Sequence, residues 1–310
     1  MIREKIVDSP NLVKRFCRDY NVPVSTYNGY WFPKQLSTLS IHDLKYVEKW
    51  DEFCKELESF NSAEDYFEYY NKVKDSVITY IQNHHEYECF NTLGFIVDKS
   101  FPKKELYCEE NHNKKFISID LRKANFNIMN WYCPTLFKGK TWEDFLADFG
   151  ASKYLQGSKY LRQVIFGACN PKKQIQAQTE LMTHIASKLD REGIKVYSVV
   201  TDEIIIECTS KNMYHDLIDL LTTENIINST GIYKITKFKL TKNELGYIKE
   251  ILNSSDVYDI GKIIFKCVDS DFMGQCIKYY YNEPIEERDL VFDYKGKVAT
   301  FNHPINNPFV

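Results

Sequence analysis

The chain has 310 residues, 44% hydrophobic and 15% aromatic, so it can bury one large or two modest cores. Its 40 basic and 43 acidic residues give a net charge of −3, so any nucleic-acid surface must be local. Nine cysteines without a Cys-x-x-Cys pair fit a reducing compartment, and argue against a disulfide framework or zinc finger. No apolar run approaches the roughly 20 residues of a membrane span, so we expect a cytoplasmic protein without membrane partners.

The beginning of the chain changes from irregular to helical. Residues 1–40 contain three prolines, which interrupt any long periodic pattern. Apolar residues then recur at three- and four-residue steps from about Ile41, and again over residues 63–81. This spacing predicts two antiparallel helices, and we expect residues 1–92 to form a mostly helical N-terminal region.

The next stretch is typical of strands and leads to an acidic residue. Residues 93–97 are a short apolar run, and residues 105–108 can pair with a strand at 115–120 across a polar hairpin loop. That strand ends at Asp120. The chain then turns toward a helix, which would allow the Leu121 carbonyl to join Asp120 as a hard oxygen ligand.

A helix-rich section follows, with helices expected at 142–149, 154–166 and 172–191. Along the second helix, Lys159 and Arg162 are one turn apart and Phe166 is a further turn on, so the three can share one face. Cations placed in this way suit the phosphates of a nucleoside triphosphate. The alternative is a solvated helix face with Phe166 in the core.

The most informative stretch is residues 195–208. Two runs of β-branched and apolar residues flank a short polar break that carries Asp202 and Glu203, which predicts a tight β-hairpin with the acids at its tip. A sheet beneath would hold them rigidly, so Asp202 and Asp120 could share a divalent cation. The alternative is that they are only turn residues.

The last third of the chain carries no motif. We expect a helix at 213–223, a strand at 233–240, a helix at 243–252, a strand at 261–268 and a hairpin at 290–301. The lysines of the first of these strands could follow a phosphate backbone. An edge strand protected by lysines is the alternative. We therefore expect three regions in the chain: the N-terminal region, a catalytic region at 93–230 and a C-terminal α+β region at 231–310.

Three windows, in this order along the chain, resemble motifs A, B and C of family A DNA polymerases and the related single-subunit phage and mitochondrial RNA polymerases. Ser118–Leu121 (SIDL) resembles motif A. Arg162–Gly167 (RQVIFG) is similar to the Lys-x-x-x-Phe-Gly of motif B, with arginine in place of lysine. Val199–Glu207 (VVTDEIIIE) is similar to motif C, with Thr201 where histidine is usual.

The chain departs from the family pattern in two places. Asn125 stands five residues after the motif A aspartate, where family A DNA polymerases place a glutamate beside the sugar. Asn170 and Pro171 replace the Tyr-Gly that follows the motif B phenylalanine. The motifs therefore set no preference between ribo- and deoxyribonucleotides. No proofreading-exonuclease segment is visible.

The resemblance implies an α+β fold: an antiparallel palm-like sheet with helices on one face, an N-terminal helical pair and a C-terminal β-containing region. It also implies a nucleotidyltransferase that adds nucleotides to a 3′-hydroxyl. Asp120 and Asp202, with the Leu121 carbonyl, would bind Mg²⁺ or Mn²⁺, and Glu203 would support the pair. A phage-like or viral protein acting inside its host cell fits this resemblance.

The same resemblance implies the substrate contacts. Lys159, Arg162 and Lys172 would hold the triphosphate. Phe166 would lie against the incoming base, and Asn125 would lie near the sugar. The partners would be nucleoside triphosphates, a primer–template nucleic acid and other replication or transcription subunits, with the N-terminal helices in the place of a thumb.

Two other functions remain open on the sequence. A template-independent or primase-like nucleotidyltransferase would use the same palm chemistry without a template grip. A polymerase-derived subunit could keep the fold and bind nucleic acid or protein without turnover, which the near-neutral charge and Asn170-Pro171 would suit.

Overall fold

The computed structural model describes residues 9–97, 99–223 and 232–305, and the chain divides into two compact units. Unit 1 consists of Met1–Gln82, Lys140–Cys169 and Val268–Val310, and unit 2 of Asn83–Gly139 and Asn170–Cys267. The two units therefore alternate along the chain, whereas the three regions expected from the sequence are consecutive.

Unit 1 is mainly helical. Its elements are α2 (Pro10–Tyr20), α3 (Trp31–His42), α4 (Lys45–Leu57), α5 (Ala63–Gln82), α8 (Trp142–Ala147), α9 (Lys153–Gly157), α10 (Lys159–Gly167), η4 (Ser270–Phe272), α13 (Met273–Tyr280), η5 (Glu287–Asp289) and the hairpin β7 (Val291–Tyr294) and β8 (Lys297–Thr300). The helix expected at 63–81 and the hairpin expected at 290–301 are confirmed.

Two expectations for unit 1 were wrong. Residues 1–40 are not irregular, because α2 and most of α3 lie there. Pro10 is the first residue of α2 and Pro33 the third of α3, positions where proline removes no hydrogen bond within the helix. The expected helix at 154–166 is interrupted at Ser158, whose side chain accepts a hydrogen bond from the Leu161 N–H and begins α10.

The core of unit 1 is aromatic and encloses one carboxylate. Phe16 of α2 stacks on Phe53 of α4 at 5.9 Å between ring centroids, and Phe53 stacks on Tyr154 of α9 at 4.7 Å. Asp19 is fully buried beside them, and accepts hydrogen bonds from the Tyr154 hydroxyl (3.0 Å) and the Ser158 hydroxyl (2.7 Å). Burial raises the pKa of this carboxyl to about 6, against the lowering effect of Arg15 and of the two hydroxyls.

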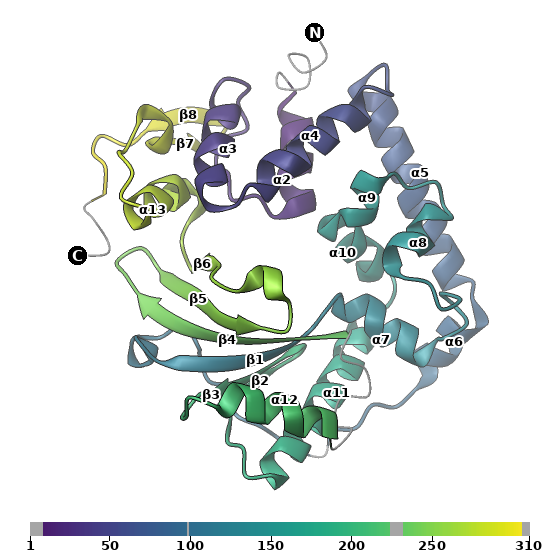
Figure 1. The fold of residues 1–310 in the computed structure, drawn as a ribbon. Coiled ribbons are helices and arrows are strands. Elements are labelled where there is room, and N and C mark those ends of the chain that lie inside the picture. Colours follow the sequence, from purple (N-terminus) through teal and green to yellow (C-terminus); the bar gives the residue numbers. More distant parts are fainter. Residues whose placement is uncertain (1–8, 98, 224–231, 306–310) are drawn as a thin grey trace. The chain divides into compact units, whose positions relative to one another are not determined.

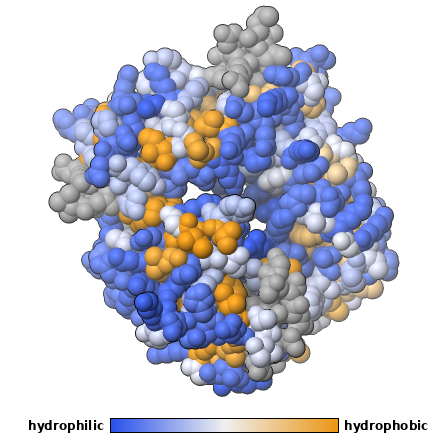
Figure 2. All heavy atoms as spheres, in the orientation of Figure 1, coloured by the Kyte–Doolittle hydropathy of each residue, from blue (hydrophilic) through white to orange (hydrophobic). Residues whose placement is uncertain are grey.

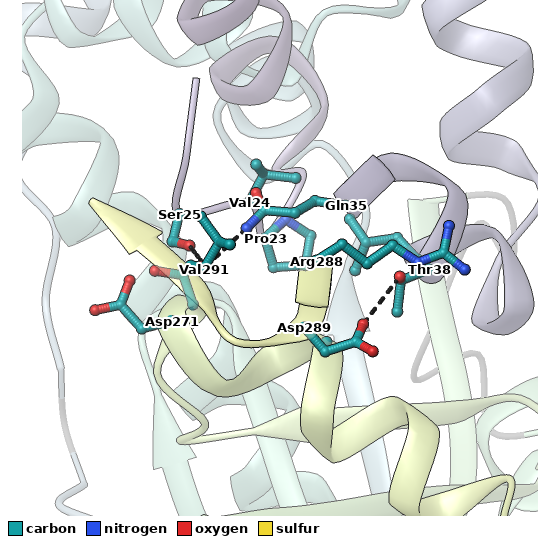
Figure 3. A pocket seen from close by; sticks show the side chains of 12 residues that line it. Pro23, Val24, Ser25, Gln35, Thr38, Asp271, Arg288, Asp289 and Val291 are labelled. Atoms are coloured by element: carbon teal, nitrogen blue, oxygen red, sulfur yellow. Dashed lines mark hydrogen bonds between the residues drawn. The ribbon is translucent and has the colours of Figure 1, made fainter. Parts of the chain in front are cut away.

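The C-terminal segment of unit 1 is held against α3 by polar contacts around a cavity of about 20 Å³, room for one water molecule (Figure 3). The Gln35 side chain donates to the Val291 carbonyl (2.9 Å), and the Thr38 hydroxyl donates to Asp289 (3.1 Å). On its other oxygen, Asp289 forms an ion pair with Lys278 at 2.9 Å. Both charged side chains are almost completely buried, so each depends on the other to offset its desolvation.

Unit 2 is built on a sheet. Its elements are α6 (His85–Thr92), η1 (Glu109–Asn111), β1 (Lys115–Leu121), α7 (Ala124–Tyr132), α11 (Pro171–Arg191), β2 (Val196–Val200), β3 (Glu203–Glu207), α12 (Met213–Thr223), β4 (Tyr233–Lys242), β5 (Tyr247–Ser254), η3 (Val257–Asp259) and β6 (Ile263–Lys266). The six strands pair antiparallel in the order β2-β3-β1-β4-β5-β6. The expected α+β fold with an antiparallel sheet is confirmed.

The pairing of β1 corrects the first half of the predicted sheet. Residues 93–97 and 105–108 form no strand, and β1 pairs instead with β3 on one side and β4 on the other. The segment at 105–108 packs on the sheet: the Leu106 side chain is buried among apolar residues of β1, β3, β4 and β5. Its apolar pattern therefore reflects burial against the sheet.

Two further expectations for unit 2 were wrong. Residues 243–252 form no helix, because most of them belong to β5. The buried positions of β5 include Ile248 and Ile251, which lie on opposite faces of the strand, and this three-residue step imitates a helix. Strand β4 is not an edge strand, and Lys237 on it is buried, with its ammonium group donating to the Lys211 carbonyl (2.9 Å).

The helices α11 and α12 cover one face of the sheet, and the opposite face is apolar at one end and polar at the other. Figure 1 shows α11 and α12 on the same side of the sheet, where α11 contacts β2 and β3. The opposite side carries the apolar cluster around Phe116 and Phe238 at one end of β1, and Ser118 and Asp120 toward the other end. This face is the one on which the candidate site lies.

The surface in the view of Figure 2 is mostly hydrophilic, with hydrophobic residues in separate patches. In unit 2, Val257 and Ile260 beside η3 are exposed, at 70% and 49%. No helix in the described part of the chain is long and apolar enough to cross a membrane.

We expect Lys278→Met to lower the free energy of unfolding by about 3–5 kcal/mol, because Asp289 would stay buried without its counter-charge. Urea unfolding measures the change. The matched control is Lys297→Met, at an exposed lysine of β8, which should change the free energy by less than about 0.5 kcal/mol. Equal small losses in both variants would contradict a structural role for the buried ion pair.

We expect the buried Asp19 to make unit 1 less stable as the pH rises. Its pKa is raised from 3.8 to about 6, so its stabilising contribution is complete below about pH 4 and is lost as the pH rises through 6. The free energy of unfolding of Asp19→Asn should therefore gain roughly 3 kcal/mol relative to wild type between about pH 3 and pH 7. Urea unfolding across this pH range measures it, with the exposed Glu68→Gln as control; parallel curves for wild type and Asp19→Asn would contradict it.

Candidate active site

The site is built around Asp120 on β1. Side chains alternate along a strand, so Asp120 shares a face of the sheet with Phe116 and Ser118. In the ladders on either side, Asp120 lies opposite Glu203 of β3 and opposite Lys234 of β4. Directly opposed residues of antiparallel strands lie close enough for their side chains to interact. The sheet therefore places one carboxylate and one ammonium group beside Asp120.

The β2–β3 hairpin brings Asp202 to the same place. Val200 pairs with Glu203, so Thr201 and Asp202 form a two-residue turn. The Asp202 carbonyl accepts a hydrogen bond from the Leu121 N–H (2.9 Å). The hairpin expected from the sequence is thus confirmed, and its tip is joined by the backbone to the end of β1.

Glu203 is held by a neighbour on β1. The Ser118 hydroxyl donates a hydrogen bond to Glu203 Oε1 at 2.5 Å, and both side chains lie on the face of Asp120. A hydrogen bond to an ionised acceptor is among the stronger ones that a side chain can make. Ser118 therefore positions Glu203, and it was not singled out from the sequence as a site residue.

The three acids form a zone of negative charge. Burial, together with the negative charges of Glu203 and Asp202, raises the pKa of Asp120 to about 6. Lys249 and Lys234 act in the opposite direction. Because Lys234 also forms an ion pair with Asp259, its charge is shared between two acids. An added cation at this place would be attracted to the acids.

Lys249 of β5 is the site residue that the sequence analysis missed. Burial lowers its pKa, against the raising effect of Glu203 and Asp120. Its ammonium group lies 4.0 Å from the centroid of the Phe238 ring, which gives it a cation–π contact. The apolar spacing of residues 243–252 predicts a helix, which hides this position; the strand that the structure has there places the lysine on the sheet.

The site offers oxygen donors, the kind of ligand that a hard divalent cation prefers. Carboxylate and carbonyl oxygens are the ligands that Mg²⁺ prefers, and Asp120, Asp202 and Glu203 supply the carboxylates. No group of three or more His, Cys, Asp or Glu residues in the described ranges is arranged to hold a metal ion. A site of the expected kind would use two aspartates and a backbone carbonyl. The expected roles of Asp202 and of the Leu121 carbonyl stay predictions.

Two more of the expected site residues belong to unit 2. Asn125 lies in the first turn of α7, and its side-chain oxygen accepts a hydrogen bond from Gln178 of α11 (2.6 Å). Lys172 is exposed in the first turn of α11. Asn125 is therefore fixed by the helix under the sheet, whereas Lys172 is available to a ligand.

The remaining expected residues belong to unit 1, so this site in unit 2 does not include them. Lys159 is exposed at the start of α10, and Arg162 is half-buried on the same helix. Phe166 has an exposed fraction of 0%, and its ring packs against that of Trp142 at 5.3 Å. This packing favours a core role for Phe166 over contact with a base.

Comparisons with protein-family models, with curated proteins and with solved structures find no match for this chain. The case for a function therefore depends on the geometry of the acids and on the three motif-like windows.

We expect Lys249→Met to strengthen the stabilisation of the protein by Mg²⁺. Removing the ammonium group leaves the acids without their main built-in counter-charge, so saturating MgCl₂ should raise the free energy of unfolding by about 1 kcal/mol more than in wild type. Urea unfolding with and without MgCl₂ measures the difference. The control is Lys239→Met on β4, whose register partners are Lys115 of β1 and Glu250 of β5, and not Asp120 or Glu203. An equal effect of MgCl₂ on all three proteins would contradict a cation site at the acids.

Proposed function

We propose that this protein is a nucleotidyltransferase of the polymerase type, which joins nucleotides to a 3′-hydroxyl. The observation that carries the proposal is the junction of β1 with the β2–β3 hairpin: Asp120 lies opposite Glu203, and the Leu121 N–H binds the Asp202 carbonyl. The two motif-like acidic segments are 82 residues apart in the chain, from Asp120 to Asp202, yet they meet on one sheet with helices on its other face.

The residues of the site would divide the work. Asp120 and Asp202 would hold Mg²⁺ or Mn²⁺, which, when bound, lowers the pKa of the attacking hydroxyl and offsets charge on the leaving pyrophosphate. Glu203, fixed by Ser118, would keep the local charge negative enough to retain the cation. Lys172 would contact the phosphates of the nucleoside triphosphate.

One observation favours a second candidate function, a polymerase-derived subunit that binds without turnover. Lys249 faces Asp120 and Glu203 and offsets part of their charge without any metal. An ammonium group held in the sheet in this way would offset the charge of the acids, and so would stabilise the fold of a protein that has lost catalysis. The same experiment separates the two functions.

The test is extension of a labelled primer on DNA and RNA templates, with Mg²⁺ or Mn²⁺ and all eight nucleoside triphosphates. We expect product from wild type, and a loss of at least about 100-fold in Asp120→Asn and in Asp202→Asn, because each removes a charged ligand from the reacting centre. Asp219→Asn, at an exposed aspartate of α12 in the same unit, should keep full activity.

The pattern of products distinguishes the alternatives. Extension that does not depend on the template would indicate a template-independent enzyme. No product from folded wild type under any of these conditions would contradict catalysis by the isolated chain, and tight binding of the primer–template in that case would support the non-catalytic subunit.

A further inference from the structure

Unit 1 has an open hollow of about 280 Å³ beside α2, lined by Asn11, Lys14, Arg15, Arg18 and, from α5, Phe67. None of the sequence motifs includes these residues. Three of the five are cations, and none of the described lining residues is a carboxylate. A chain with a net charge of −3 therefore has a local basic site here.

The cations are aligned by the helix. The four lining residues of α2 follow one another at three-, one- and three-residue steps, which is the spacing of a single helix face. The buried residues of α2 include Leu12, Val13, Phe16 and Cys17, on the face that packs into unit 1. Burial of this apolar face fixes the rotation of α2, and so presents the polar face to the hollow.

Arg15 is held more rigidly than a surface arginine. Its guanidinium carbon lies 4.3 Å from the centroid of the Tyr70 ring and 4.8 Å from that of Tyr160. Its Nη1 atom is 3.9 Å from Asp19, too far for a hydrogen bond, and its Nε and Nη1 atoms have no hydrogen-bond partner among the described residues. The two tyrosine rings therefore hold the Arg15 guanidinium at the wall of the hollow, where its charge adds to those of Lys14 and Arg18.

The other two cations of the hollow are exposed. Lys14 and Arg18 form no ion pair with any carboxylate in the described ranges. Like charges on one helix face repel each other, and an anion between them would relieve that repulsion. Arginine and lysine together are typical of contacts to phosphate oxygens.

Phe67 indicates which phosphate the hollow would take. Its side chain is half-buried at the wall of the hollow, so part of it remains accessible to a ligand. Binding sites for single strands combine cations that contact the backbone with aromatic side chains on which bases stack. Free phosphate would use the cations alone.

We propose that this hollow binds a backbone phosphate of single-stranded nucleic acid, with the neighbouring base on Phe67. The inference shares its class of partner with the proposed function, but it needs none of the acids of unit 2. It can therefore be tested in Asp120→Asn without Mg²⁺, where the failure of one proposal leaves the other intact.

The first measurement is fluorescence anisotropy of a labelled oligo(dT) strand of about 12 nucleotides, titrated at several salt concentrations. We expect the Lys14→Ala/Arg18→Ala pair to weaken binding about tenfold, and to reduce the slope of log K against log salt by about 0.7, the loss of one phosphate contact. Lys55→Ala/Lys72→Ala, at two exposed lysines of α4 and α5, removes the same charge from the same unit and should change little. Equal weakening in both pairs would overturn the site.

The second measurement identifies the ligand. We expect Phe67→Leu, which keeps an apolar side chain, to weaken binding of oligo(dT) and to leave binding of an abasic strand of the same length unchanged. Equal losses for both strands would overturn the stacking contact. Displacement of oligo(dT) by millimolar inorganic phosphate, with similar affinities for the two, would indicate a free-phosphate site and overturn the nucleic-acid assignment. Circular dichroism of each variant establishes that it is folded.

Discussion

The pairing of β1 between β3 and β4 is the constraint on which the sheet of unit 2 and its site depend. Because strand side chains alternate, a shift of one residue would move both Asp120 and Phe116 to the helix-covered face. The register that buries Phe116 against Phe238 is the same one that places Asp120 opposite Glu203. The apolar packing that stabilises the sheet thus also positions the acids.

The spacing of apolar residues predicted an element correctly where it followed the period of either a strand or a helix throughout. The β2–β3 hairpin followed from two β-branched runs with a two-residue break, and α5 and α11 from their helical spacing. Pairing between distant segments was not predictable, because no local signal states that β1 joins β3 and β4. At β5, Ile248 and Ile251 are buried on opposite faces of the strand, and a single sequence window cannot distinguish this three-residue step from a helix.

The residues of the candidate site were predictable only where they lie in a motif-like window. Asp120, Asp202 and Glu203 stand in motif-like windows, and the structure brings their segments together. Lys249 lies in no motif, since its importance arises only when β5 is placed beside β4. Phe166 is the opposite case. Its place in a motif-like window predicts contact with a base, but the structure packs its ring against Trp142 in the core.

The alternation of the two units along the chain has a consequence for biosynthesis. All segments of unit 2 have been made once residue 267 is added, but unit 1 needs the segment from Val268 onward, which includes Lys278 and Asp289. Until then the aromatic helices α2 to α5 lack the partner that packs on α3. A ribosome-bound intermediate with a finished sheet and an incomplete helical unit is therefore built into the order of the segments, and it is the stage at which a chaperone would have apolar surface to bind.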